Sequence, residues 1–178
     1  MMKTVVRLLA LLAGVTLGYW FPDFDQDTTA LVHRSIVTHG PLVPLLLYVA
    51  LGSRGSPAPA RLFVTGTALA VAIHLCFDLF PKGWAGYALI HVPSIGWTPP
   101  LVSWGWIAIS IILCFYIAIK SAQGWIESTL VFVGIVAVFS YSLPTEDALW
   151  RPFVAALGGS AIAVVLVTRR ASAEGLQT

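Results

Sequence analysis

Acidic and histidine side chains occur in three short segments of the sequence, at spacings that suit a metal ion. Asp23 and Asp25 flank Phe24 in the stretch PDFDQD, directly after the first apolar run. Alternate residues of an extended turn point the same way, and paired carboxylates suit a hard or borderline cation. A solvated acidic turn is the alternative interpretation of this pair. Asp27 directly precedes two threonines, and we interpret it as a helix cap.

A second pair, His74 and Asp78, lies four residues apart within an apolar run. On a helix these side chains share one face, where an imidazole and a carboxylate form a usable pair of metal ligands. A hydrogen bond that merely satisfies both groups is the alternative. We expect His74 and Asp78 to bind a metal together with Asp23, Asp25 and His39.

His39 belongs to the third segment, HRSIVTH, which also holds His33 and Arg34. The planar guanidinium of Arg34 can hold an anionic substrate or neutralise carboxylates, whereas snorkelling to lipid head groups is the alternative. His33, or His91 in the later stretch IHVPSIGW, is the candidate general base. His91 can also be an ordinary interfacial histidine. We therefore assign Arg34, His33 and His91 as candidate catalytic residues.

The composition indicates that membrane helices must position these residues. The chain has 178 residues, of which 58% are hydrophobic and only 10% are charged, against about 25% charged in an average soluble domain. The net charge of +2 is too small for a nucleic-acid binder. Cys76 and Cys114 lie inside apolar runs, which indicates buried thiols and not a disulfide framework. The composition therefore excludes an ordinary soluble domain, a disordered chain and a nucleic-acid partner.

Crossing a bilayer takes roughly 17 to 25 predominantly apolar residues. Candidate spans cover residues 4–21, 29–52, 62–79, 101–119, 126–143 and 152–168. We expect an all-α bundle of about six transmembrane helices that forms one domain over residues 1–178. The second span is unusual because its first half holds Arg34 and two histidines, and a charge at membrane depth is costly unless it is paired. Small residues at 158–161 are the predicted helix-packing surface.

The distribution of lysine and arginine predicts that both termini lie inside the cell. With six spans, the inner side receives seven of these residues and the outer side three, Arg34, Lys82 and Arg151. All four histidines and the aspartates then lie on the outer side. The first run lacks a convincing cleavage site, so we interpret it as a retained helix. The glycine-rich, aromatic loop 80–100 is interpreted as a re-entrant or lid-like segment.

Taken in order, the motifs PDxD, HR…TH and HxxxD followed by LF resemble the YdjM-like family over about residues 18–98. These are small bacterial and archaeal membrane proteins regarded as metal-dependent hydrolases. The chain departs from the family pattern in three places, since HRSIVTHG is one residue longer before Thr38, Gly40 replaces a serine and Gln26 replaces a histidine. The extra residue rotates His33 relative to His39, which leaves open which of the two is the ligand.

The resemblance implies a membrane-embedded, metal-dependent hydrolase at the outer face of a bacterial or archaeal cytoplasmic (inner) membrane. The predicted ligands would hold one or two divalent ions, with zinc favoured over manganese or magnesium. An activated water would attack a lipid or lipid-linked ester or phosphoester. The alternatives are a metal-ion or proton transporter and a non-catalytic structural protein with a stabilising metal or ion-pair cluster. The expected partners are membrane lipids; the sequence does not specify an oligomeric state.

Overall fold

The computed structural model describes residues 2–80, 88–142 and 150–175. Helices dominate these residues, which confirms the all-α prediction. The helices are α1 (Met2–Trp20), the 3-10 helix η1 (Pro22–Gln26), α2 (Leu42–Leu51), α3 (Ala58–Asp78), α4 (Pro100–Ser121), α5 (Gly124–Ser142) and α6 (Trp150–Gly175). A small antiparallel hairpin pairs β1 (His91–Val92) with β2 (Gly96–Trp97).

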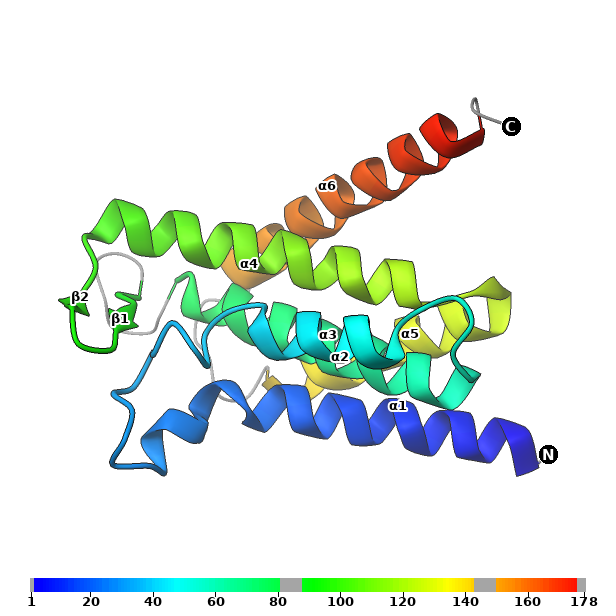
Figure 1. The fold of residues 1–178 in the computed structure, drawn as a ribbon, viewed down its shortest axis with the longest axis horizontal. Helices are drawn as coiled ribbons and strands as arrows, with labels where there is room; N and C mark the ends of the chain where they lie inside the picture. The colour runs from blue at the N-terminus through cyan, green and yellow to red at the C-terminus, as the bar shows by residue number, and fades with distance from the viewer. Residues whose placement is uncertain (1, 81–87, 143–149, 176–178) are drawn as a thin grey trace.

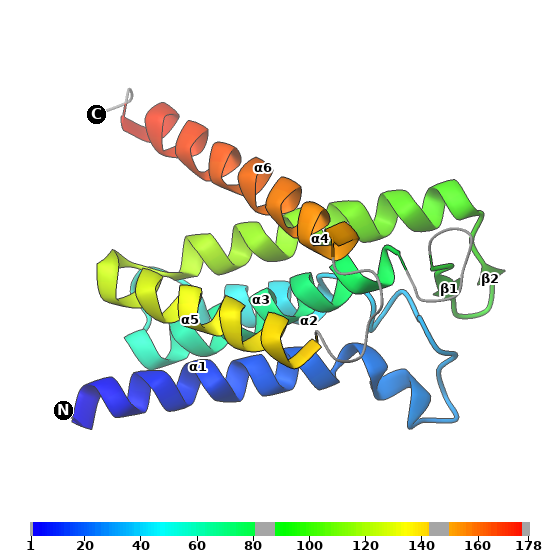
Figure 2. The same ribbon diagram turned by 180° about the vertical axis from the view of Figure 1, so that it is seen from behind.

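Helix α3 forms the centre of the bundle. Figure 1 shows α1 and α4 running along opposite sides of α3 with α2 in front, and Figure 2 shows α5 in front from the opposite direction. Residues 64–73 of α3 are buried without interruption, so the middle of this helix is enclosed on every side. Helix α6 crosses α4 and diverges from the bundle toward its C-terminal end (Figures 1 and 2). The end of α3 that carries His74 and Asp78 is therefore fixed by neighbours on several sides.

Glycines allow α1 and α3 to approach at backbone contact. A Cβ placed on Gly14 would lie 2.1 Å from the carbonyl oxygen of Phe63, and one on Gly18 would lie 2.3 Å from that of Thr67. Small residues four apart allow this kind of close crossing between membrane helices. Within the predicted packing surface at 158–161, a Cβ on Gly159 would lie 2.7 Å from Ile111 Cγ2 of α4, whereas one on Gly158 would meet no atom within 4 Å.

Helix α2 corrects the prediction of a span over residues 29–52. The helix covers only Leu42–Leu51, and residues 27–41 form turns with a single bridge at Ser35. The physical reason is competition for backbone donors, because the carboxylate of Asp25 accepts the backbone N–H of Ser35 at 2.9 Å. Pro41 then supplies the residue at which the helix begins.

Four helices among the described residues are long and apolar enough to cross a membrane: Lys3–Gln26, Ala58–Asp78, Pro100–Ser121 and Trp150–Arg170. Leu42–Leu51 and Gly124–Ser140 are apolar but shorter. These helices are compatible with an integral membrane protein. The expected number of about six crossings remains a prediction. Trp84 and Tyr87 of the predicted lid-like loop lie outside the described residues.

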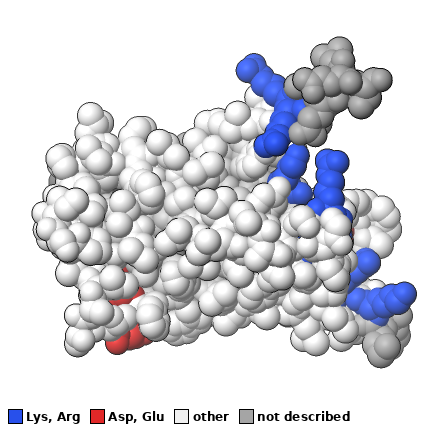
Figure 3. All heavy atoms as spheres, in the orientation of Figure 1, with Lys and Arg blue, Asp and Glu red and all other residues white. Residues whose placement is uncertain are grey.

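The visible surface is electrically polarised along the bundle. Figure 3 shows lysine and arginine side chains gathered at the end near both termini and acidic side chains at the opposite end. At the basic end, the buried Arg61 Nη2 donates to Glu127 Oε1 at 2.7 Å and joins α3 to α5. Glu127 is thus salt-bridged. Cys76 and Cys114 are buried free thiols, as predicted.

Replacing Gly14 by alanine tests the contact between α1 and α3. The added methyl group meets the backbone of Phe63, and overpacking of this kind lowers the free energy of unfolding by about 1–3 kcal/mol. Gly158→Ala is the matched control, since open space surrounds that position, and its effect should stay within about 0.5 kcal/mol. Thermal midpoints of both variants in detergent measure the difference. Equal midpoints would contradict the close approach.

Candidate metal centre

Three segments distant in the sequence meet at the C-terminal end of α3. Asp78 Oδ2 lies 3.3 Å from His39 Nε2 and 3.3 Å from His74 Nε2. His39 comes from the loop 27–41, while His74 and Asp78 share a face of α3 as their spacing predicted. Asp23 Oδ1, on η1, lies 3.9 Å from His74 Nε2. The loop and α3 thus bring three candidate ligand atoms together, from His39, His74 and Asp78, and Asp23 lies at the edge of this group.

The separations suit a shared divalent ion. Two ligands of a tetrahedral zinc ion, each about 2.0–2.1 Å away from it, lie about 3.3–3.4 Å apart. His39 Nε2 and Asp78 Oδ2 are also buried and make no hydrogen bond within the described part of the chain. Buried polar atoms are nearly always satisfied, so this pair is satisfied either by a bound ion or, when His39 is protonated, by the ion pair between the two atoms. The residues therefore fit a metal.

Asp25 lies behind His39 and not beside the other candidate ligands. Its Oδ2 accepts the Ser35 backbone N–H and the Thr38 hydroxyl, at 2.9 and 2.5 Å, and lies 3.3 Å from His39 Nδ1. A carboxylate next to Nδ1 favours a proton on that nitrogen and leaves the Nε2 lone pair directed at an ion. The arrangement is that of an orienting carboxylate. That Asp25 is itself a ligand stays a prediction.

The same carboxylates control the charge of His39 when no ion is present. Burial on its own lowers the pKa of this imidazole. The neighbouring carboxylates of Asp25 and Asp78 outweigh burial and raise the pKa of His39 to about 9. An ion-free centre would therefore carry an imidazolium between two aspartates, whereas an ion at Nε2 would take the place of that proton.

His33 and Asp23 form the open side of the cluster. Asp23, His33 and His39 offer ligand atoms within 4.8 Å of one another, as do His39, His74 and Asp78. The side chains of Asp23 and His33 are 40% and 39% exposed, but that of His39 is fully buried. His33 Nδ1 lies 3.2 Å from Asp25 Oδ1. His39 belongs to both groups, which favours it over His33 as the principal ligand.

Arg34 lies against the centre with an unusual backbone conformation. Its φ of 61° lies in the left-handed region, and its Nε is 3.5 Å from Asp78 Oδ1. Arg34 thus approaches the carboxylate oxygen that faces away from the histidines. Left-handed conformations of non-glycine residues cost free energy, and they cluster at functional sites.

The structure separates the ring of His91 from both ligand groups. The backbone of β1 pairs with the site loop, since His91 N–H donates to Arg34 O at 2.9 Å and Ile36 N–H donates to His91 O at 2.8 Å. The imidazole lies edge-on to Trp97, with ring centroids 5.2 Å apart. His91 therefore braces the loop through its backbone, and its role as a base or ligand remains a prediction.

Two further aromatic residues support the centre without a signal in the sequence. Trp106 Nε1, on α4, donates to the carbonyl oxygen of His39 at 2.8 Å. Tyr19, near the end of α1, packs edge-on against His74 with ring centroids 6.2 Å apart. Both contacts join residues far apart in the chain, so no local spacing could reveal them. The Thr38 hydroxyl donates to the carboxylate of Asp25 and also lies within hydrogen-bond distance of Ser35 O.

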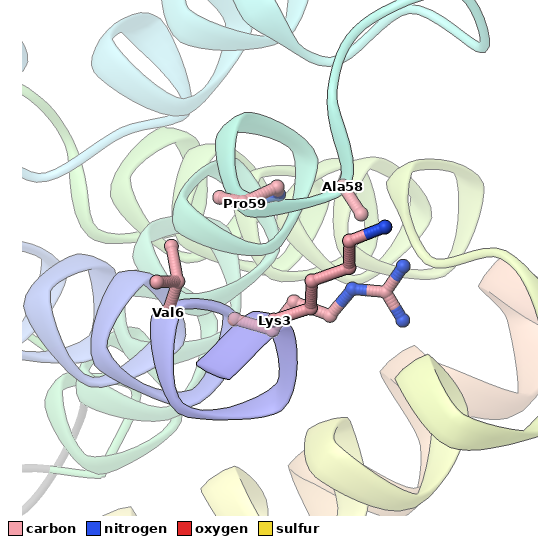
Figure 4. Close-up of a pocket in the computed structure, with 5 residues that line it drawn as sticks. Lys3, Val6, Ala58 and Pro59 are labelled. Atoms are coloured by element: carbon pink, nitrogen blue, oxygen red, sulfur yellow. The ribbon is translucent and has the colours of Figure 1, made fainter. Parts of the chain in front are cut away.

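A hollow at the opposite end of the molecule has different chemistry. Lys3, Val6, Arg7, Ala58 and Pro59 line a space of about 250 Å³ between the starts of α1 and α3, and Figure 4 shows the Lys3 side chain beside Ala58. Its lining holds no carboxylate and no imidazole. The candidate metal chemistry therefore belongs to the acidic end of the bundle.

Comparison of the chain with family models, curated proteins and solved structures found no match. The resemblance to the YdjM-like family accordingly remains a prediction that rests on the three motifs.

Removing the charge of Asp25 should weaken metal binding without removing a ligand. In Asp25→Asn the amide no longer fixes the Nδ1–H form of His39, and loss of such a partner typically costs 10- to 100-fold in affinity. Asp27→Asn is the matched control, because Asp27 is exposed. Titration of the purified, metal-stripped proteins with zinc measures both. Equal affinities would contradict the orienting role.

Proposed function

We propose that this protein is a membrane-embedded, metal-dependent hydrolase that acts on a lipid or lipid-linked ester or phosphoester. One observation carries the proposal. His39 Nε2, His74 Nε2 and Asp78 Oδ2 converge at ligand-to-ligand distances, and two of these atoms are buried without hydrogen bonds in the described residues. His39, His74 and Asp78 would hold the ion, and Asp23 is the fourth candidate ligand.

A divalent ion held there, zinc by preference, supplies Lewis acidity and makes a water molecule acidic near neutral pH. The residues of the chain do the remaining work. Asp25 fixes the tautomer of His39, and His33, at the open side, is the candidate acceptor of a proton from water. Arg34 supplies positive charge next to Asp78, where an anionic substrate group or transition state would be stabilised.

The open side favours a catalytic site over a closed structural one. A structural metal is enclosed by four protein ligands, whereas a catalytic metal keeps a position for water or substrate. Here the exposed edges of Asp23 and His33 leave one side of the cluster accessible. An ion-pair cluster without metal is the competing interpretation, in which a charged His39 bridges the two aspartates.

A transport function has less support from the described residues. A path across the bundle needs polar groups along the middle of α3, where residues 64–73 are buried. The polar members of this stretch, Thr65 and Thr67, donate to carbonyl oxygens one turn earlier in the same helix. They therefore offer no chain of sites for an ion.

The charge distribution supports a proposal for the side of the membrane on which the centre lies. Basic side chains gather at the end that holds the termini, and the candidate centre lies at the acidic end (Figure 3). Because basic residues favour the cytoplasmic side, we assign the centre to the outer face of a cytoplasmic membrane. A substrate that resides in the outer leaflet can reach a centre at this level, which favours a lipid or lipid-linked molecule.

Elemental analysis of the detergent-purified protein tests the ligand set. The parent should contain a stoichiometric divalent ion, and His39→Ala and Asp78→Ala should contain less than a tenth of it, since each removes a buried ligand. His91→Ala is the control histidine and should keep the ion, because its ring lies outside both ligand groups. If the parent protein neither contains nor takes up zinc or manganese, the proposed hydrolase function is overturned.

Arg34→Lys should impair catalysis more than assembly. Lysine keeps the positive charge but loses the planar fork that binds a carboxylate or phosphate through two hydrogen bonds. We expect the metal content to be unchanged and the rate of hydrolysis, screened on phosphatidic acid and on acyl esters, to fall by at least tenfold. Full activity in this variant would place Arg34 at the lipid head groups and not at the substrate.

A further inference from the structure

A crevice between α1 and α5 lies next to the metal centre. Val15, Thr16, Tyr19, Trp20, Ala137 and Val138 line a space of about 260 Å³. The residues from α1 belong to its last two turns, and those from α5 belong to its C-terminal half. The crevice therefore occupies the same half of the bundle as His74 and Asp78.

One side chain links the crevice to the centre. Tyr19 forms part of the crevice wall, and its ring packs edge-on against His74 at 6.2 Å between centroids. His74 Nε2 in turn lies 3.3 Å from Asp78 Oδ2. A molecule in the crevice thus lies only one aromatic ring away from a predicted metal ligand.

Helices α1 and α5 pack against each other on the basic side of the crevice. There α5 approaches α1 at Gly134, whose Cβ would lie 3.8 Å from Leu11 Cδ2 and 4.0 Å from Val15 Cγ2. Val138 is buried and forms part of the packed core, so it supplies a firm inner wall. The lining residues Trp20 and Ala137 are exposed.

The lining chemistry selects an apolar occupant. Most of the surface that the crevice offers is hydrocarbon or aromatic. Its hydroxyl groups belong to Tyr19 and to Thr16, whose Oγ1 donates to Leu12 O at 3.0 Å within its own helix. Leu9, Leu12 and Leu17 on the same helix are exposed, as expected for a surface that faces lipid tails. The space therefore continues the lipid-facing surface of α1 inward to the centre.

We propose that one acyl chain of a lipid from the surrounding leaflet occupies this crevice and brings the head of that lipid to the metal centre. The inference rests on the proposed function and narrows its substrate to a chain-bearing lipid that enters sideways between α1 and α5. The volume suits a segment of one chain and not a whole lipid, so the head group remains outside the crevice, on the side of His74.

Two tryptophan substitutions on α5 test the crevice. Ala137→Trp fills it, because Ala137 lines it and is exposed, so the larger ring is accommodated without disturbing the core. Val136→Trp is the matched control, since Val136 is the adjacent residue, is 48% exposed and does not line the crevice. Both proteins are reconstituted in phosphatidylcholine nanodiscs, and their zinc content is measured first. Neither substitution touches a predicted ligand, so both variants should bind zinc as the parent does.

The first readout is independent of hydrolysis. A phosphatidic acid with a photoactivatable diazirine on one 16-carbon chain is crosslinked to each protein, and the labelled residues are mapped by mass spectrometry. We expect labels at Val15, Tyr19 and Val138, at least fivefold fewer in Ala137→Trp, and parent levels in Val136→Trp. Equal labelling of the crevice in Ala137→Trp, or labels spread evenly over exposed residues, would overturn the proposal.

The second readout separates the two proposals. If the protein hydrolyses phosphatidic acid, Ala137→Trp should lose at least tenfold in rate on the 16-carbon lipid and keep the parent rate on the soluble dibutyryl form. Equal rates on the 16-carbon lipid for Ala137→Trp and the parent would overturn the proposal that the crevice holds an acyl chain. They would leave the proposed hydrolase function intact. Crevice labelling without hydrolysis of any lipid would count against the hydrolase and support the crevice as a lipid site.

Discussion

The buried carboxylate of Asp25 is the interaction on which the rest of the centre depends. It accepts the backbone N–H of Ser35 and the hydroxyl of Thr38, and it lies beside His39 Nδ1. A carboxylate that is almost fully enclosed is costly unless its oxygens are satisfied, and here the loop supplies the donors. The same contacts keep residues 27–41 out of a helix and turn His39 toward α3. Loop conformation and ligand orientation thus have one physical cause.

Where a long apolar run is not interrupted by polar residues, it predicted the position of a helix. The predicted span 62–79 ends one residue beyond α3, and the predicted span 101–119 lies entirely inside α4. A long apolar run in a membrane protein has few conformations other than a helix to adopt. The run at 29–52 differed because polar side chains in its first half compete for backbone hydrogen bonds, and that competition depends on Asp25, outside the run. The contacts of Gly14 and Gly18 depend on which face of α1 packs against which face of α3. A single sequence does not specify that pairing.

The candidate site also has a part that the sequence predicts and a part that depends on tertiary contacts. The pair of His74 and Asp78 was predictable, since one helical turn fixes their relative position. The place of His39 between Asp25 and Asp78, and the brace from Trp106, depend on how the loop folds against α3 and α4. Likewise Arg61 pairs with Glu127 across 66 positions of sequence. Residue type identified the chemistry, but only the tertiary contacts divide the residues into candidate ligands, supports and exposed groups.

The glycine contact between α1 and α3 also has a kinetic consequence. Asp23 follows directly from α1, and His74 and Asp78 end α3, so the tight crossing of these helices fixes three of the four candidate ligands relative to one another. His39, on the irregular segment 27–41, is the ligand best able to swing away. Exchange of an ion would therefore be governed by the rate at which this segment opens. The lifetime of the ion in the site would depend on how long the hydrogen bonds between this segment and Asp25 persist.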